Sequence, residues 1–148
     1  MMALTLEQAS VIVEGALKRA AEIGRRPMTV AVLDAGGYLV AFKRQNGSGI
    51  LRPDIAHGKA WGALGMGVGS RALAERALTA PGFFTALASA SHGRVIPVPG
   101  GVLVLDGRRE IAGAVGVSGD LPDIDESCAI YGIEQAGLTA AAGEVTPH

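Results

Sequence analysis

The chain has 148 residues, with 13 Lys and Arg against 14 Asp and Glu and a formal net charge of −1. This balance excludes the basic footprint of a protein that binds nucleic acid or an anionic membrane. Hydrophobic residues make up 49% of the chain, which is enough for a compact core. No apolar run reaches the roughly 18 residues of a membrane span, and no secretion signal opens the chain. We therefore expect one cytoplasmic domain over residues 1–148.

The first predicted elements are a helix and a β-hairpin. Thr5 to Gln8 has the pattern of a capping box, and apolar residues at helical spacing follow it as far as a stop at Gly24. Two apolar runs, 29–33 and 38–42, then flank the segment from Asp34 to Gly37. Turn residues between two such runs predict a hairpin.

Three helices are expected in the middle of the chain. A polar loop from Arg44 to Gly49 leads into a helix from Pro53 to about Met66. Its internal glycines lower intrinsic helix stability, so this helix needs close packing against the rest of the fold. Ser70 is expected to cap a short helix over 71–78, and Pro81 to open another that ends near Gly93.

A second hairpin is predicted from Val102 to Leu105 and from Ile111 to Val117. Both runs are almost continuously apolar, which favours strands that are covered on both faces. Asp106-Gly107 follows the first run, and this dipeptide favours a type I′ turn with positive φ at both central residues. The order of helix, hairpin, helices, hairpin and a last helix opened by Pro122 predicts an α+β fold, with helices packed on a mainly antiparallel sheet.

Acidic residues crowd the start of this last helix. Favourable interaction with the helix dipole is the simplest interpretation, and a divalent-metal site is the alternative. The residues concerned are Asp120, Asp123, Asp125 and Glu126.

The richest functional segment runs from Arg52 to Trp61. Asp54 and His57 are three residues apart and share a helix face, so Asp54 could orient the imidazole and raise its basicity. Lys59 points in another direction around the helix. These residues suggest a catalytic site in which His57 is a general acid or base, Asp54 orients it and Lys59 lies beside the substrate. The simpler interpretations are a surface or interface histidine and a lysine whose amino group points into solvent.

An anion site is the companion hypothesis. Arg44 could fold back toward this helix through its glycine-containing loop, and Gly100 and Gly101 offer backbone N–H groups. Arg44, Lys59, Gly100 and Gly101 would then hold the carboxylate of a small ligand. For Arg44 alone, a solvated strand end is the simpler interpretation.

Several short motifs together resemble the GlcG/HbpS-type haem-binding family, which includes the C-terminal domain of PduO-type proteins. The resemblance spans about Leu4 to Ala140, and the chain departs from the family pattern at Trp61-Gly62, where a small polar residue is usual. The motifs are Asp34-Ala35-Gly36-Gly37-Tyr38-Leu39, Ile55-Ala56, Lys59-Ala60, Pro99-Gly100-Gly101, Gly116-Val117-Ser118-Gly119, and Asp125-Glu126 with Ala129.

The resemblance implies a profilin-like sheet with helices, a homo-oligomer and binding of haem or a related tetrapyrrole. His57 would be the ligand of the haem iron, with His92 as the second candidate. Two other functions stay open: a cofactor-independent lyase or isomerase that acts on a small organic acid of a catabolic pathway, and a non-catalytic oligomeric partner.

Overall fold

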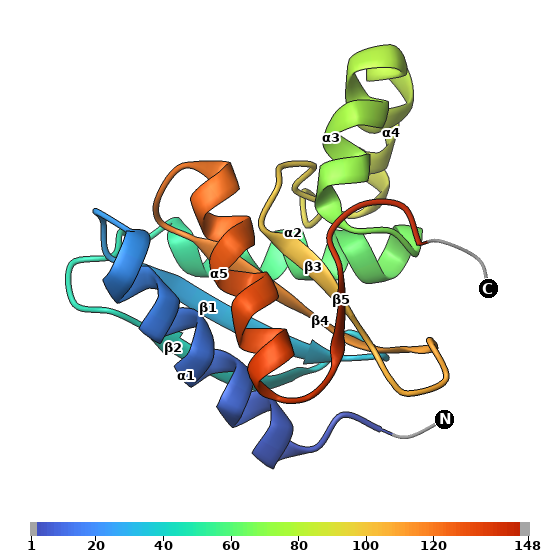
Figure 1. Cartoon of the computed structure of the whole chain (residues 1–148). Helices are drawn as coiled ribbons and strands as arrows, with labels where there is room; N and C mark the ends of the chain where they lie inside the picture. Colours follow the sequence, from blue (N-terminus) through green and yellow to red (C-terminus); the bar gives the residue numbers. More distant parts are fainter. Residues whose placement is uncertain (1–2, 146–148) are drawn as a thin grey trace.

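A computed structural model describes residues 3–145, which form a five-stranded antiparallel sheet with five helices (Figure 1). The strand order is β2-β1-β4-β3-β5. The strands are β1 (Thr29–Asp34), β2 (Leu39–Arg44), β3 (Gly101–Leu105), β4 (Ile111–Ser118) and β5 (Thr139–Ala141). The helices are α1 (Leu6–Ile23), α2 (Arg52–Met66), α3 (Ser70–Thr79), α4 (Pro81–Ala90) and α5 (Pro122–Gln135).

Helices cover the two faces of the sheet unequally. α1 and α5 pack side by side on one face, and α2 crosses the other face over β1, β4 and β3 (Figure 1). The capping box of α1 is present, because Gln8 N donates to Thr5 Oγ1 and Thr5 N donates to Gln8 Oε1, both at 3.0 Å. The α+β fold expected from the order of elements is confirmed.

Glycines bring α2 unusually close to the sheet. A Cβ on Gly116 of β4 would lie 1.8 Å from the Ala56 carbonyl oxygen, and one on Gly101 of β3 would lie 2.2 Å from that of Lys59. Both distances are far inside van der Waals contact, so only glycine fits at these two positions. The close packing expected of this glycine-rich helix is therefore confirmed.

The predicted hairpin between β3 and β4 is present, but the prediction of a type I′ turn at Asp106-Gly107 is wrong. The connection spans Asp106 to Glu110, and Asp106 Oδ1 accepts the N–H groups of Arg108 and Glu110, both at 2.9 Å. The residue with positive φ is Arg109, at 61°, and not Gly107. The Asp106 carboxylate therefore organises a longer loop, whereas the prediction relied on glycine geometry.

Two further local expectations change. Ser70 does not cap α3: Gly69 is the N-cap, and the Ser70 hydroxyl donates to Val98 O at 2.6 Å and accepts from Gly101 N at 2.7 Å. The strand β5, which pairs with β3, was not predicted.

The acidic residues at the start of α5 have specific partners beyond the helix dipole. Arg71 of α3 forms ion pairs with Asp123 at 2.6 Å and with Glu126 at 2.9 Å. Asp120 accepts a backbone N–H from the loop after α1 at 2.7 Å. Between residues 3 and 145, no cluster of three or more His, Cys, Asp or Glu side chains could hold a metal ion.

Within the same described range, no helix combines the length and hydropathy of a membrane span.

Candidate functional site

One part of the sheet stays uncovered by helices, and we call it the open face. It consists of the β2 side chains that point toward the α2 side, namely Leu39, Phe42 and Arg44. Leu39 is paired with Leu33, which packs under α2, and paired residues of neighbouring strands point to the same side of a sheet. Leu39 is 55% exposed and Phe42 is 40% exposed, so apolar surface remains open beside α2.

His57 and Trp61 lie on the flank of α2 that faces β2. A Cβ on Gly37, in the turn between β1 and β2, would lie 3.3 Å from Trp61 Nε1. His57 precedes Trp61 by one helical turn and therefore shares this flank. A pocket of about 180 Å³ lies between this turn and α2; it is lined by Ala35, Gly36, Gly37, Trp61, Leu64 and Gly65.

The predicted pair of Asp54 and His57 does not form a hydrogen bond. Asp54 is exposed in the first turn of α2, where the helix dipole favours a carboxylate. His57 is half-buried, and its imidazole has no hydrogen-bond partner or ion pair in the described part of the chain. The ring nitrogens of His57 are therefore available to an external ligand, and the role of Asp54 as an orienting group has no structural support.

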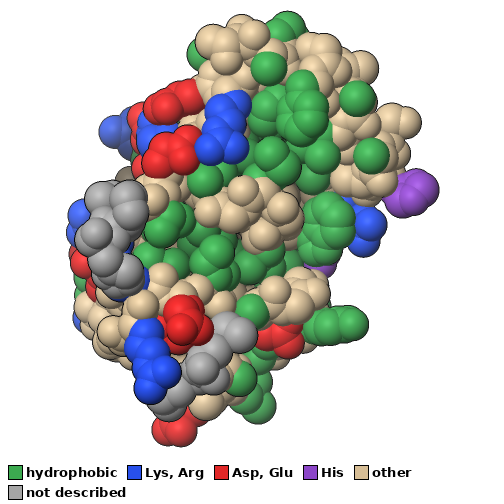
Figure 2. Space-filling view, turned by 90° about the vertical axis from the view of Figure 1, so that its right-hand side faces the viewer, with side chains coloured by type: hydrophobic (Ala, Val, Ile, Leu, Met, Phe, Trp, Pro, Cys, Tyr) green, Lys and Arg blue, Asp and Glu red, His purple; other side chains and the backbone are tan. Residues whose placement is uncertain are grey.

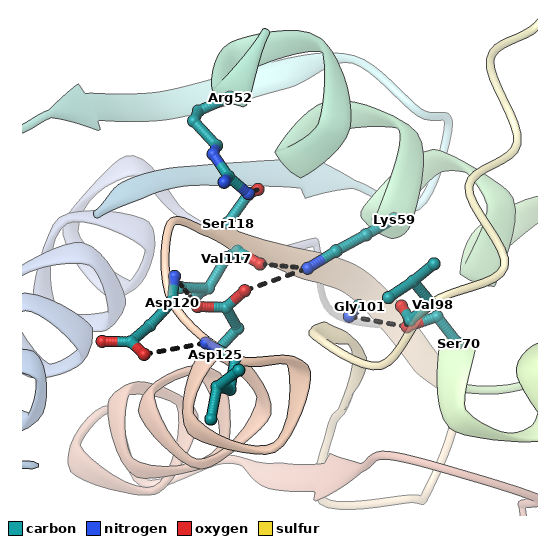
Figure 3. A network of polar contacts seen from close by, with 10 residues as sticks. Arg52, Lys59, Ser70, Val98, Gly101, Val117, Ser118, Asp120 and Asp125 are labelled. Carbon is teal, nitrogen blue, oxygen red and sulfur yellow. Dashed lines mark hydrogen bonds and ion pairs between the residues drawn. The ribbon is translucent and has the colours of Figure 1, made fainter. Parts of the chain in front are cut away.

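Lys59 belongs to a buried network on the opposite flank of α2 (Figure 3). Its side chain is 3% exposed, and Nζ donates to Val117 O at 2.9 Å and to Asp125 Oδ2 at 3.2 Å. Asp125 Oδ1 accepts the N–H of Asp120 at 2.9 Å. Val117 lies next to the last residue of β4, and Asp125 lies in the first turn of α5. Lys59 therefore joins the helices of both faces at one end of the sheet.

Burial opposes charge on both members of this pair. Desolvation lowers the pKa of Lys59 from 10.5, while the attraction of Asp125 acts in the opposite direction. Desolvation likewise raises the pKa of Asp125 from 3.8, against the attraction of Lys59 and two backbone N–H groups. Each charge is tolerated in the core because the other is present.

The remaining predicted anion-site residues divide between these two regions. Gly100 and Gly101 lie against Lys59: a Cβ on Gly100 would be 2.8 Å from Lys59 Nζ, and the Gly101 N–H is already bonded to the Ser70 hydroxyl. Arg44 lies on the open face, where Nη1 donates to Ser48 O at 2.9 Å. The structure thus brings Lys59, Gly100 and Gly101 together in the interior and leaves Arg44 with the flank of His57.

The amino-acid sequence matches the model of a known family over most of its length. The model of the family described as "Haem degrading protein HbpS-like" matches residues 4–134. The chain belongs to the HbpS-like family.

Solved structures agree with the HbpS-like assignment. A double mutant of HbpS from Streptomyces reticuli is 28% identical, covers 90% of this chain and 87% of its own, and has a TM-score of 0.76. The Klebsiella pneumoniae protein ORFY is 27% identical over 93% of both chains, with a TM-score of 0.80. A PduOC protein, crystallised as a haem complex, is 24% identical over 93% of this chain and 97% of that one, with a TM-score of 0.83, and shows the shared fold. None of the curated proteins matches the chain.

Sequence reasoning missed several residues of this candidate site. In the sequence, Leu39 and Phe42 are typical strand residues. Only the order of strands in the sheet shows that β2 is an edge strand that α2 does not cover. Asp125 was assigned to the helix dipole, because no local pattern links it to Lys59, 66 residues away. Arg94 lies in a loop that carries no motif.

Proposed function

We propose that this HbpS-like chain binds haem or a related tetrapyrrole on the open face, with His57 as the ligand of the iron. The observation that carries the proposal is a half-buried imidazole without a protein partner beside exposed Leu39 and Phe42. Family membership and the haem complex of the PduOC neighbour support the same ligand class.

The residues present fit such a group. A tetrapyrrole needs an apolar surface for its ring, a nitrogen ligand for the metal and a cation for its carboxylates. Leu39, Phe42, His57 and the exposed Arg44 supply these three features, and neutral imidazole is a common ligand of haem iron. Bound haem would supply a redox-active iron; the chain's own residues would orient it and exclude water from one side.

The pocket beside Trp61 cannot enclose this ligand alone. Its volume of about 180 Å³ is below the roughly 300 Å³ at which small-molecule pockets usually begin. The open face must therefore provide most of the contact area.

A haemin titration tests the proposal. Wild-type protein should give a saturable Soret shift, and His57→Ala should weaken binding by about ten-fold or more, because loss of an iron ligand removes at least ~1.4 kcal/mol. His92→Ala is the matched control, since His92 is exposed in the loop after α4. A loss in His92→Ala with none in His57→Ala would reassign the ligand, and no saturable shift in wild type would reject haem binding.

The small-acid enzyme has less support from the structure. Lys59 is committed to Asp125 inside the protein, and Asp54 does not bond to His57. We therefore retain His57 as a ligand-binding residue and do not propose the lyase or isomerase.

Self-association, expected from the sequence, remains a proposal. α4 has no buried residue, and no charged side chain occurs between Ala77 and Ser91. Leu78 is 84% exposed and Phe83 is 54% exposed. Hydrophobic side chains gather in the upper part of the molecule, at the height of α3 and α4 (Figure 2). An uncharged apolar surface of this kind favours contact with a second copy.

Sedimentation at micromolar concentration checks this proposal. Wild type should sediment above the 15.0 kDa of one chain, and Phe83→Glu should shift the distribution toward that mass, because it places a charge in the apolar contact. Tyr38→Glu, at an exposed position outside α4, is the control. A wild-type protein that is entirely monomeric would contradict the proposal.

A further inference from the structure

We propose that Arg94, stacked on Trp61, is a carboxylate-binding residue of the same flank, so that the ligand carries at least one carboxylate near its ring. The ring system of the ligand is taken from the proposed function, on which this inference rests. The carboxylate is inferred from the geometry of Arg94.

The first step is the position of the loop that carries Arg94. A Cβ on Gly58 would lie 2.6 Å from Arg94 O and 2.4 Å from Ile96 Cγ1, and one on Gly62 would lie 3.0 Å from Val95 Cγ1. The two glycines of α2 therefore allow this loop to lie directly on the helix. Ile96 N also donates to Gly58 O, at 3.4 Å. The backbone of Arg94 is thus held against the helix that carries His57.

The second step is the position of the guanidinium group. Its Cζ atom lies 4.0 Å from the centre of the Trp61 ring, and its Nε donates to Ser91 O at 2.9 Å. Stacking on an indole and a bond at Nε hold the side chain in one orientation before any ligand arrives. The cation therefore loses little further freedom when it binds an anion.

The third step is what the guanidinium leaves unused. Arginine has five N–H donors, and the Nη1 and Nη2 groups of Arg94 have no hydrogen bond or ion pair within the described residues. By contrast, Arg71 and Arg76 each form ion pairs with carboxylates of the chain. A stacked guanidinium with free Nη donors has the geometry that binds a carboxylate with two parallel hydrogen bonds.

The last step connects this cation to the proposed iron ligand. Trp61 follows His57 by four residues, which places their Cβ atoms about 6 Å apart on one helix flank. Arg94 is exposed, so a ligand that touches His57 can reach it from solvent. A planar ligand with carboxylates at its rim matches this spacing of imidazole, indole and guanidinium.

The experiment compares haemin with haemin dimethyl ester, which lacks the free carboxylates. Wild type should bind haemin about ten-fold or more tightly than the ester, the ratio expected for one charge-assisted hydrogen bond. Arg94→Gln should reduce this preference through weaker haemin binding and leave the affinity for the ester nearly unchanged. Arg108→Gln, at an exposed site in the loop between β3 and β4, is the matched control and should keep the preference. An unchanged preference in Arg94→Gln, or an equal loss for both ligands, would overturn the inference.

A second probe separates this inference from the proposed function. Trp61 is the one tryptophan of the chain, so its fluorescence reports directly on the Arg94 contact. Benzoate should quench it saturably, benzamide should not, and Arg94→Gln should abolish the difference. If wild type binds neither haemin nor the ester but shows this benzoate response, haem binding fails and Arg94 keeps its role. If benzoate acts equally on wild type and Arg94→Gln, the role of Arg94 fails whatever haemin does.

Discussion

Lys59→Met should lower the free energy of unfolding by about 3–5 kcal/mol, the usual effect of removing one partner of a buried ion pair. The variant keeps the length of the side chain but leaves the Asp125 carboxylate in the core without its cation. Val117 O also loses the donor that lies 2.9 Å away. Urea denaturation at pH 7, followed by circular dichroism, measures the change.

Two variants control this result. Lys43→Met removes the exposed ion pair of Lys43 with Glu14 and should cost less than ~1 kcal/mol. The double variant Lys59→Met/Asp125→Leu removes both buried charges and should recover much of the lost stability, because no unpaired charge remains. A loss in Lys59→Met as small as that in Lys43→Met would show that the network contributes little.

The deficit of Lys59→Met should also depend on pH. Burial already raises the pKa of Asp125 above 3.8, and removal of the cation raises it further. At a pH between the pKa of Asp125 in the unfolded and in the folded variant, the folded state therefore carries a proton on this carboxyl that the unfolded state lacks. Its stability relative to wild type should improve as the pH falls from neutral through this folded pKa, and a deficit that grows with acid would contradict this assignment.

Gly116→Ala should destabilise the fold by about 1–3 kcal/mol or more, because one methyl group at this position overpacks the core. Its Cβ would lie 1.8 Å from the carbonyl oxygen of Ala56 and 3.2 Å from the amide nitrogen of Ala60. Both atoms belong to the backbone of α2, which cannot rotate away as a side chain would. Relief requires α2 to move off the sheet. Thermal and urea unfolding measure the effect.

Gly107→Ala is the matched control for this substitution. Gly107 is exposed in the loop between β3 and β4, nothing lies within 4 Å of a Cβ built there, and its φ is not positive. Its stability should change by no more than about 0.5 kcal/mol. A large loss of stability in Gly107→Ala would support a type I′ turn at this position after all. If Gly116→Ala is as stable as wild type, α2 packs less closely on the sheet than the structure indicates.

Several elements could be predicted directly because their sequence signals are local. The capping box of Thr5 and Gln8, the turn residues from Asp34 to Gly37 and the proline that opens α5 each act within a few residues, so their patterns predict structure directly. The two hairpins and the order of elements then led to the α+β fold. The motifs resembling the HbpS family were equally local, and they identified the family correctly.

The contacts between distant residues could not be predicted from the sequence, because they depend on how the elements pack. Lys59 and Asp125 are 66 residues apart, and their pairing depends on how α2 and α5 meet at the end of β4. The open face exists because α2 spans β1, β4 and β3 and leaves the edge strand β2 uncovered, a property of sheet order rather than of any single segment. Arg94 likewise reaches Trp61 because Gly58 and Gly62 let its loop rest on the helix. Such contacts join segments that are far apart in the sequence. The spacing of residues within one segment predicts its secondary structure but not its contacts with another segment.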